Sequence, residues 1–273
     1  MEKGFIELLF GSLREYVENF NQLFLIVLLF TIIPTIIIFL ISLVIPQSMT
    51  DSVMDVSRNL YQSGFDREAL TFISLSFILI AISFILRYLI QPPCLIFFAL
   101  KNTGDLKAGE AIKGGLNYLW KYLGYGILLS LFFGVIGGVF VLVISLFIIY
   151  AHPQSVLWVY PFYFVWIAIL AFFLIRWQFA FYTIVEEDIG IIGCFGRSAE
   201  LVNGRWWRVF FYNMLMGISA IVIAFLIMWP MFVFESITLN LVLNTIFVVI
   251  LIPLIVIYLK NFYLDLKDNP LQY

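Results

Sequence analysis

Charged residues are scarce in this chain. They make up 12% of its 273 residues, whereas soluble globular domains carry about a quarter. Hydrophobic residues reach 63%, and the mean hydropathy is +1.07. A composition this apolar excludes an ordinary soluble domain and indicates a protein that resides in lipid.

Histidine and cysteine are also nearly absent. The single histidine, His152, cannot supply a histidine-based metal cage, and Cys94 and Cys194 form neither a C-x-x-C pair nor a disulfide framework. We therefore expect two structural thiols. The sequence contains no H-E-x-x-H, G-x-S-x-G or P-loop motif. We predict no metal, no cofactor and no enzymatic activity.

Positive charge is too sparse for general nucleic-acid binding. The net charge is −2 and the pI about 5.4, whereas nucleic-acid-binding domains are basic. One segment, residues 196–211, is an exception, because it holds Arg197, Arg205 and Arg208 beside Trp206 and Trp207. Tryptophan is favoured at membrane interfaces. We therefore interpret this segment as a topological anchor at the lipid headgroups.

Long apolar runs dominate the sequence instead. Several approach roughly 20 residues, the length needed to cross the hydrocarbon core. They lack the strict alternation of a membrane β-barrel, so they must be helices. We predict an all-α polytopic membrane protein, a single integral membrane domain over residues 1–273. Its six transmembrane helices are expected at residues 22–45, 71–91, 123–150, 157–176, 209–229 and 237–259.

The distribution of Lys and Arg predicts the orientation. Of the 15 basic residues, 11 fall on the side of the N-terminus, only Arg58 and Arg67 fall on the opposite side, and Arg87 and Arg176 sit within or at the edge of spans. Because positive charge is retained inside, both termini are expected to be cytoplasmic, in the inner (cytoplasmic) membrane of a cell.

The three inner segments resemble one another. Each begins at an acidic residue, Glu2, Asp105 or Asp188, continues as an amphipathic stretch and leads into a hairpin of two spans. We expect Asp105 and Asp188 to be helix N-caps. In the middle copy Ile112, Leu116 and Trp120 share one helical face, which we predict to lie in the headgroup plane. The pattern predicts interfacial helices and a threefold repeat of helix plus hairpin.

In each predicted hairpin, a basic residue marks the inner end of the second of its two spans. By its distance along the helix, each of Arg87, Arg176 and Lys260 reaches the inner boundary, where it can extend toward lipid phosphates. With the anchor arginines they make membrane lipids the expected partner. The apolar pieces beyond Arg87 and Arg176 should project inward and pack against the amphipathic helices, with a kink at Pro92-Pro93.

Two further patterns lie inside the spans. Gln91, Gln178, Asn240 and Asn244 either line a cavity or form hydrogen bonds between helices. Gly126, Ser130, Gly134 and Gly138 recur every four residues, which predicts a smooth ridge for close helix packing. That ridge leaves open a homo-oligomer or another membrane-protein partner.

One segment resembles a known family. The run RWQFAFYTIVEEDIGIIGCFGRSAELVNGRWWRVFFYNML, residues 176–215, is similar to the membrane domain fused to some bacterial glycerophosphodiester phosphodiesterases and to related stand-alone membrane proteins. The resemblance implies a six-helix membrane fold. It carries over no catalytic residue, because the fused enzymes hold their active site in a separate soluble domain.

Together these features predict a non-enzymatic integral membrane protein that engages lipids or supports transport or membrane organisation. The alternative is a small-solute transporter or channel, with the polar residues of the spans along its path.

Overall fold

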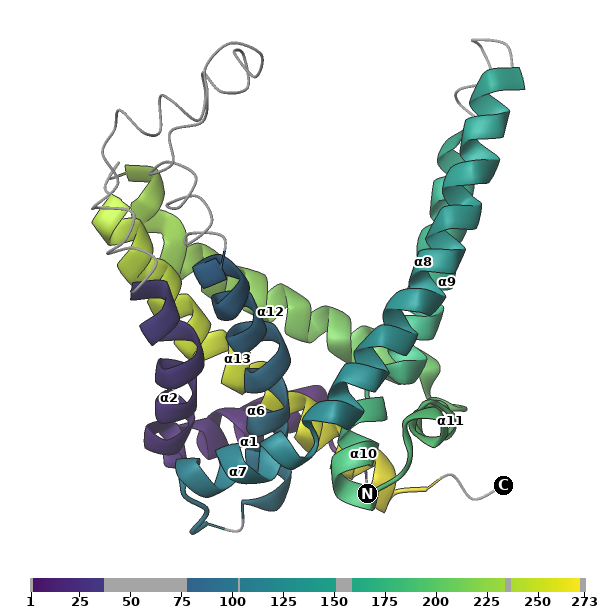
Figure 1. Ribbon diagram of the computed structural model, residues 1–273. Helices are drawn as coiled ribbons and strands as arrows, with labels where there is room; N and C mark the ends of the chain where they lie inside the picture. Colours follow the sequence, from purple (N-terminus) through teal and green to yellow (C-terminus); the bar gives the residue numbers. More distant parts are fainter. Residues whose placement is uncertain (1, 37–77, 103, 151–158, 234–236, 271–273) are drawn as a thin grey trace, which may run out of the picture.

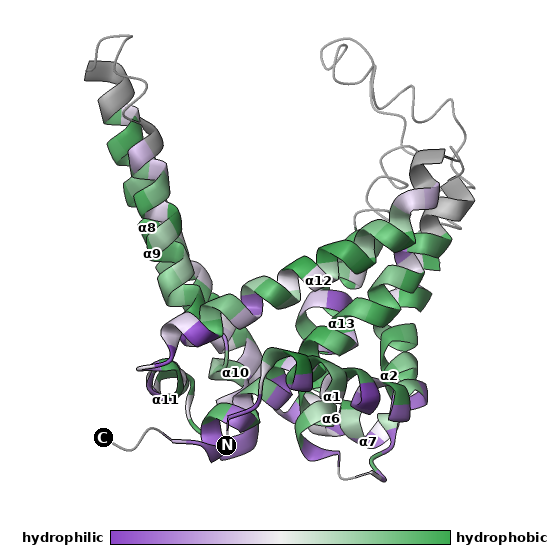
Figure 2. Cartoon of the chain, turned by 180° about the vertical axis from the view of Figure 1, so that it is seen from behind, coloured by the Kyte–Doolittle hydropathy of each residue, from purple (hydrophilic) through white to green (hydrophobic). Residues whose placement is uncertain are grey.

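Long apolar helices extend from a base of shorter helices (Figure 1). This computed structural model describes residues 2–36, 78–102, 104–150, 159–233 and 237–270, and all regular structure in these ranges is helical. Hydrophilic residues are concentrated at the base, whereas the long helices are mostly hydrophobic (Figure 2). The predicted all-α class is confirmed.

Five helices in the described ranges are long and apolar enough to cross a membrane: Ile78–Lys101, Leu119–Leu146, Pro161–Glu187, Trp206–Pro230 and Val242–Asp268. A sixth span results if the pair Phe5–Glu18 and Phe20–Ile36, bent by 79°, is counted as one. These helices are consistent with a multi-pass membrane protein. The outer parts of the predicted spans 22–45 and 71–91 lie outside the described residues.

In each hairpin the second helix leads back to the base, and we call it the returning helix. It continues well beyond its predicted inner end. The first consists of residues 78–84, η2 (Ile85–Ile90) and α6 (Gln91–Lys101). The second, α9 (Val159–Trp177), is followed by α10 (Ala180–Glu187). The third, α13 (Ile237–Asp268), passes Lys260 without a break. These continuations build the base, as expected for the first two.

The two prolines of α6 follow a π-helical turn. Pro92 and Pro93 occupy the first turn of α6, directly after η2. A proline inside a helix lacks an N–H donor and clashes with the carbonyl four residues earlier. Residues 78–101 nevertheless form one helix, and the π turn directly before the prolines is the irregularity found at the predicted kink.

Three amphipathic helices tie the base together. These are α1 (Phe5–Glu18), α7 (Ala108–Asn117) and α11 (Ile191–Val202). α7 packs on α6, α11 packs on α9 and α10, and α1 packs on α13. The returning helix of each hairpin therefore packs against the amphipathic helix that precedes the next hairpin. Because α1 packs on α13, the first and last helices also meet, and these contacts form a closed ring. The interfacial position of these helices and their origin by duplication stay predictions.

Small residues lie at the centre of each of these contacts. Ser12 of α1 and Ser198 of α11 are fully buried, and so is Ala111 of α7. The predicted apolar face is divided: Ile112 of α7 packs against the core, whereas Leu116 is exposed. Trp120, which belongs to α8 (Leu119–Tyr150), is 78% exposed. A helix can cross another closely only where its side chains are small, so the larger apolar residues are left on the outer face.

The predicted N-caps are wrong. α7 begins after Lys107 and α11 after Gly190, and neither start has a side-chain capping hydrogen bond. Both helices start two or more residues after the aspartate, beyond the reach of its carboxylate. Asp188 instead ends α10 in a left-handed conformation with φ of 52°.

The hydrophobic core lies in the base. Its largest fully buried side chains come from the continued returning helices, and they include Tyr258, Tyr263, Phe98, Phe179 and Phe262. Burying a side chain of this size stabilises the fold by about 1.5–3 kcal/mol. The apolar stretches of the long helices, in contrast, expose most of their large side chains. The buried packing contacts of the described residues are thus concentrated in the base.

The second hairpin leans away from the rest of the molecule. α8 (Leu119–Tyr150) and α9 lie side by side and diverge from α12 (Trp206–Val233) and α13 (Figures 1 and 2). Edge-to-face and stacked rings join the two helices, with Phe132 against Trp177 at 4.6 Å and Phe140 against Trp166 at 4.8 Å. The divergence leaves room between the hairpins near the base.

The contact of α7 with α6 predicts a sharp difference between two glycines of one helix. A Cβ at Gly115 would lie 2.5 Å from the Cα of Cys94, whereas one at Gly109 would meet nothing within 4 Å. We expect Gly115→Ala to lower the free energy of unfolding by about 1–3 kcal/mol through overpacking. Gly109→Ala, the matched control, should be neutral or raise it by up to about 1 kcal/mol. Denaturant titration of both variants in detergent checks this, and equal effects would contradict the packing.

Candidate functional site

The anchor arginines at the start of α12 are bound within the protein. Arg208 Nη2 donates to Asp265 Oδ2 at 2.7 Å and to the Lys3 carbonyl at 2.8 Å. Asp265 is almost completely buried, with its side chain 1% exposed. A second carboxylate, that of Glu2, lies 3.3 Å from Arg208 Nη1. Arg208 therefore fastens the N-terminal segment to α13.

Arg205 has the same role one turn earlier. Its Nη1 donates to the Leu266 carbonyl at 3.2 Å, its Nη2 donates to the Asn269 carbonyl, and its Nε forms an ion pair with Glu2 at 3.0 Å. Gly204, with φ of +75°, provides the turn that brings Arg205 there from α11. Whether Arg205 and Arg208 also bind lipid phosphates stays a prediction.

The two tryptophans of the anchor point to different surroundings. Trp206 stacks on Phe210 at 5.3 Å and contacts Phe172 of α9, to whose carbonyl its indole donates. Trp207 is 66% exposed, as a residue at the lipid interface would be. Only Trp207 therefore fits the predicted interfacial position by exposure.

The acidic cluster 186–188 joins several elements of the base. Glu186 pairs with Lys101 at 2.7 Å, Glu187 with Arg197 at 3.0 Å, and Asp188 with Lys121 at 2.6 Å. Lys267 approaches the first two at 3.6 and 3.8 Å. The hydrogen bond with Glu187 raises the pKa of Arg197 above its ordinary value. The cluster is therefore a structural junction, with each carboxylate already paired.

The three residues expected at the inner boundary differ in their partners. Lys260 binds Glu15 of α1, with Nζ–Oε1 at 2.7 Å. Arg87 and Arg176 have no carboxylate partner among the described residues, and their guanidinium groups lie 5.6 and 5.2 Å from the rings of Tyr88 and Phe172. Within the described structure these two cations therefore contact aromatic rings and no anion.

The small-residue ridge of α8 faces away from the rest of the described structure. A Cβ added at Gly126, Gly134 or Gly138 would meet nothing within 4 Å, and Ser130 is exposed. Close packing on this ridge by a second copy or another membrane protein stays a prediction.

Both cysteines are free and buried. Cys194 donates to the Ile191 carbonyl, and burial raises the pKa of its thiol to about 11. A thiol in this state is protonated and unreactive at neutral pH. Two free, buried thiols agree with the expectation, and their structural role stays a prediction.

The amide residues of the spans take up different positions. Gln91 is buried, and its Oε1 accepts a hydrogen bond from Thr31 Oγ1 at 2.6 Å. Gln178 Oε1 accepts from Asn213 Nδ2 at 2.5 Å. Asn244 is exposed on α13, and the side chain of Asn240 lies outside the described part of the chain. Of the three whose side chains the structure describes, Gln178 lines a large cavity, and Gln91 and Asn244 do not.

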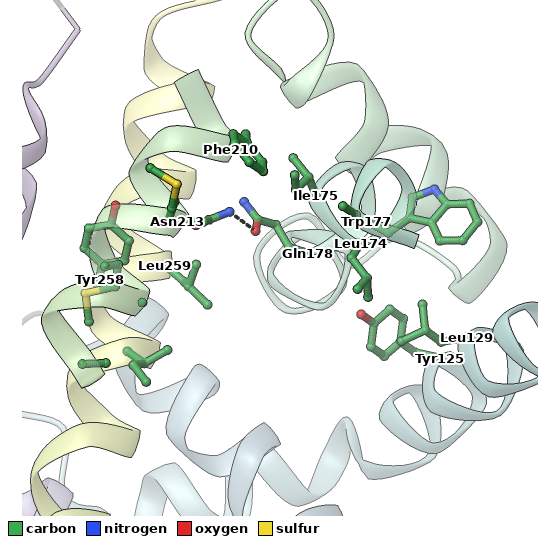
Figure 3. A pocket seen from close by; sticks show the side chains of 16 residues that line it. Tyr125, Leu129, Leu174, Ile175, Trp177, Gln178, Phe210, Asn213, Tyr258 and Leu259 are labelled. Atoms are coloured by element: carbon green, nitrogen blue, oxygen red, sulfur yellow. Dashed lines mark hydrogen bonds between the residues drawn. The ribbon is translucent and has the colours of Figure 1, made fainter. Parts of the chain in front are cut away.

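This cavity is a cleft between the second hairpin and α12–α13. Its volume is about 650 Å³. One wall is formed by α8 and α9 and the other by α12 and α13 (Figure 3). Residues that line it include Tyr125, Leu129, Ala171, Leu174, Ile175, Trp177, Phe210, Met214, Gly217, Ala220, Ile255 and Leu259. Nearly all of this surface is apolar.

The polar exception is the amide pair Gln178–Asn213, which bridges the two walls (Figure 3). Gln178 Nε2 is buried and has no hydrogen-bond partner within the described structure. An unpaired buried donor destabilises the protein by about 1–3 kcal/mol. A ligand carbonyl that accepted from Nε2 would remove that cost.

Of the amide pair in the cleft, the sequence pattern singled out Gln178 but not Asn213. It lies inside the predicted span 209–229, where a polar side chain is itself unusual. Gly217 and Ala220 follow it by four and seven residues, on the same helical face. An asparagine that shares a helical face with two small residues was the sequence signal that could have identified this position.

No protein-family model, curated protein or solved structure matches this chain.

The Arg208–Asp265 pair generates a stability prediction. Arg208→Met leaves the buried carboxylate of Asp265 without its cation, so it should lower the free energy of unfolding by about 3–5 kcal/mol. Arg14→Met removes an exposed pair with Glu18 and should change it by less than about 1 kcal/mol. Adding Asp265→Asn to Arg208→Met should restore part of the loss. Denaturant titration measures all three, and a mild effect of Arg208→Met would argue against a clamp.

Proposed function

We propose that this protein is a non-enzymatic integral membrane protein that binds a lipid, with an acyl chain held in the cleft between the second hairpin and α12–α13. The single observation that carries the proposal is the cleft itself. It lies between helices that are apolar enough to span a bilayer, and its lining is apolar as well.

The size and chemistry of the cleft suit an acyl chain. Its volume of about 650 Å³ falls within the roughly 300–1,000 Å³ typical of ligand pockets. Leu174, Met214 and Ile255 offer only van der Waals contact. A hydrated solute would have to lose its water without replacement hydrogen bonds, so the lining favours a lipid over the alternative of small-solute transport.

The amide pair supports a lipid that carries a carbonyl group. Gln178 Nε2 is the free donor, and the ester carbonyl of a glycerolipid is an acceptor of matching chemistry. This contact would orient the lipid in the cleft.

The distribution of charge supports the orientation predicted from the sequence. The basic residues assigned to the inner side belong to the elements of the base, including α1, α7, α11 and the last turns of α13. Because positive charge is retained on the cytoplasmic side, we place the base and both termini in the cytoplasm of a cell with this protein in its inner membrane.

The segment that carries the family resemblance also builds the cleft. Residues 176–215 contribute Trp177, Gln178, Phe210, Asn213 and Met214 to its walls. If the chain shares the fold of the membrane domains that resemble it, the lipid-binding cleft is a feature to expect in them as well.

Photo-crosslinking tests the proposal. A phospholipid with a diazirine near the middle of one acyl chain is incorporated into membranes that contain the full protein. Mass spectrometry should then map the adducts to residues 171–178, 213–220 and 255–259, which form the walls.

A cleft-filling variant sharpens this test. Ala220→Trp places a large side chain in the cleft and should remove most adducts from these segments. Gly134→Trp on the outer face of α8, where a Cβ has open space, is the matched control and should leave them unchanged. Adducts spread evenly over all exposed helix faces, or unaffected by Ala220→Trp, would refute lipid binding in the cleft.

A further inference from the structure

The first hairpin contains a second cavity of different chemistry. Its volume is about 190 Å³, and it lies between the helix Phe20–Ile36 and residues 80–88 of the returning helix. Thr31, Thr35, Ser83, Arg87 and Tyr88 contribute to its lining. Unlike the cleft between the hairpins, this cavity therefore combines a cation with hydroxyl groups.

The cation in this cavity has no counter-ion among the described residues. Arg87 belongs to a helix that is long and apolar enough to span a membrane, and no carboxylate among the described residues pairs with it. At the inner boundary of a span, an arginine without a counter-ion extends toward an available anion such as a phosphate. Other basic residues, such as Lys260 and Arg208, form ion pairs with carboxylates of the chain.

The backbone on both sides of the cavity is unusual. η1 (Leu28–Ile32) and η2 (Ile85–Ile90) are both π-helical, and they contact each other. π turns are rare, and they occur frequently at functional sites. The two π turns supply Thr31 from one wall and Arg87 from the other.

We propose that this cavity binds a phosphate group, with the guanidinium of Arg87 as the main donor and the Ser83 hydroxyl as a second. The planar fork of arginine matches phosphate oxygens through paired hydrogen bonds. Thr31 and Thr35 donate instead to Gln91 Oε1 and to the Thr31 carbonyl, so they shape the wall. The site lies on a different hairpin from the acyl-chain cleft and does not depend on it.

Native mass spectrometry of the full protein in detergent tests the proposal with three probes: dioleoylphosphatidylglycerol, dioleoylglycerol and inorganic phosphate. The diacylglycerol has the same acyl chains without phosphate, so it isolates the contribution of that group. A phosphate bound as part of a lipid gives a stronger signal with the phospholipid, whereas a free anion site gives it with inorganic phosphate.

Arg87→Gln should weaken binding of the preferred phosphate probe about tenfold or more, since a hydrogen-bonded charge is lost, and should leave dioleoylglycerol unchanged. Arg87→Lys and Ser83→Ala should give intermediate losses. Arg176→Gln removes another arginine that has no carboxylate partner among the described residues; it is the matched control and should stay within about twofold.

Unchanged binding of both phosphate probes in Arg87→Gln would overturn the proposal, and so would an equal loss in Arg176→Gln. If Arg87→Gln fails to fold, Ser83→Ala and Arg87→Lys still decide the matter, because neither removes the charge. Failure here leaves crosslinking in the other cleft unaffected, so the two proposals can be judged separately.

Discussion

The buried contact of Arg208 with Asp265 is the interaction on which the rest of the structure depends. It joins the start of α12 to the end of α13, and the Lys3 backbone N–H donates to the same carboxylate at 3.0 Å. Around it, Lys260 binds Glu15, and Asn261 Nδ2 donates to Ser12 Oγ at 3.1 Å. The first helix of the chain is thereby held on the last one. Since α7 and α11 pack on the first and second hairpins in the same manner, the contact of α1 with α13 completes a ring.

A fold that is closed at its base does not need its long helices to pack tightly along their length. In lipid, apolar side chains gain little from contact with each other, because the acyl chains around them are equally apolar. The core of the base supplies the packing instead, and the second hairpin is free to lean away from α12. The cleft beside Gln178 and Asn213 is the direct consequence. Its lining is almost entirely apolar, and this is the basis for proposing an acyl chain as its occupant.

The sequence was sufficient for the helical class and for the inward continuation of the first two returning helices, because apolar periodicity and length determine both. It was not sufficient for the partners of the arginines. Arg205 and Arg208 were expected at lipid headgroups, but their nearest anions are Glu2 and Asp265, which only the closed ring brings close. Likewise, the buried face of α7 consists of Ala108, Ala111 and Gly115, because the distance to α6 selects small residues over the larger apolar ones. Neither fact follows from local pattern, since both depend on which helices meet.

Closure of the ring by α1 on α13 is tested most directly by disulfide formation in native membranes. Ser12 and Asn261 lie in hydrogen-bond contact, 249 residues apart in the chain. The double variant Ser12→Cys, Asn261→Cys should form an intramolecular disulfide on mild oxidation, detected as a shift in electrophoretic mobility that reductant reverses. The pair Gly11→Cys, Asn261→Cys, with Gly11 on the exposed side of α1, should not. Absence of the first cross-link, or equal yield of both, would contradict a structure held together at its base.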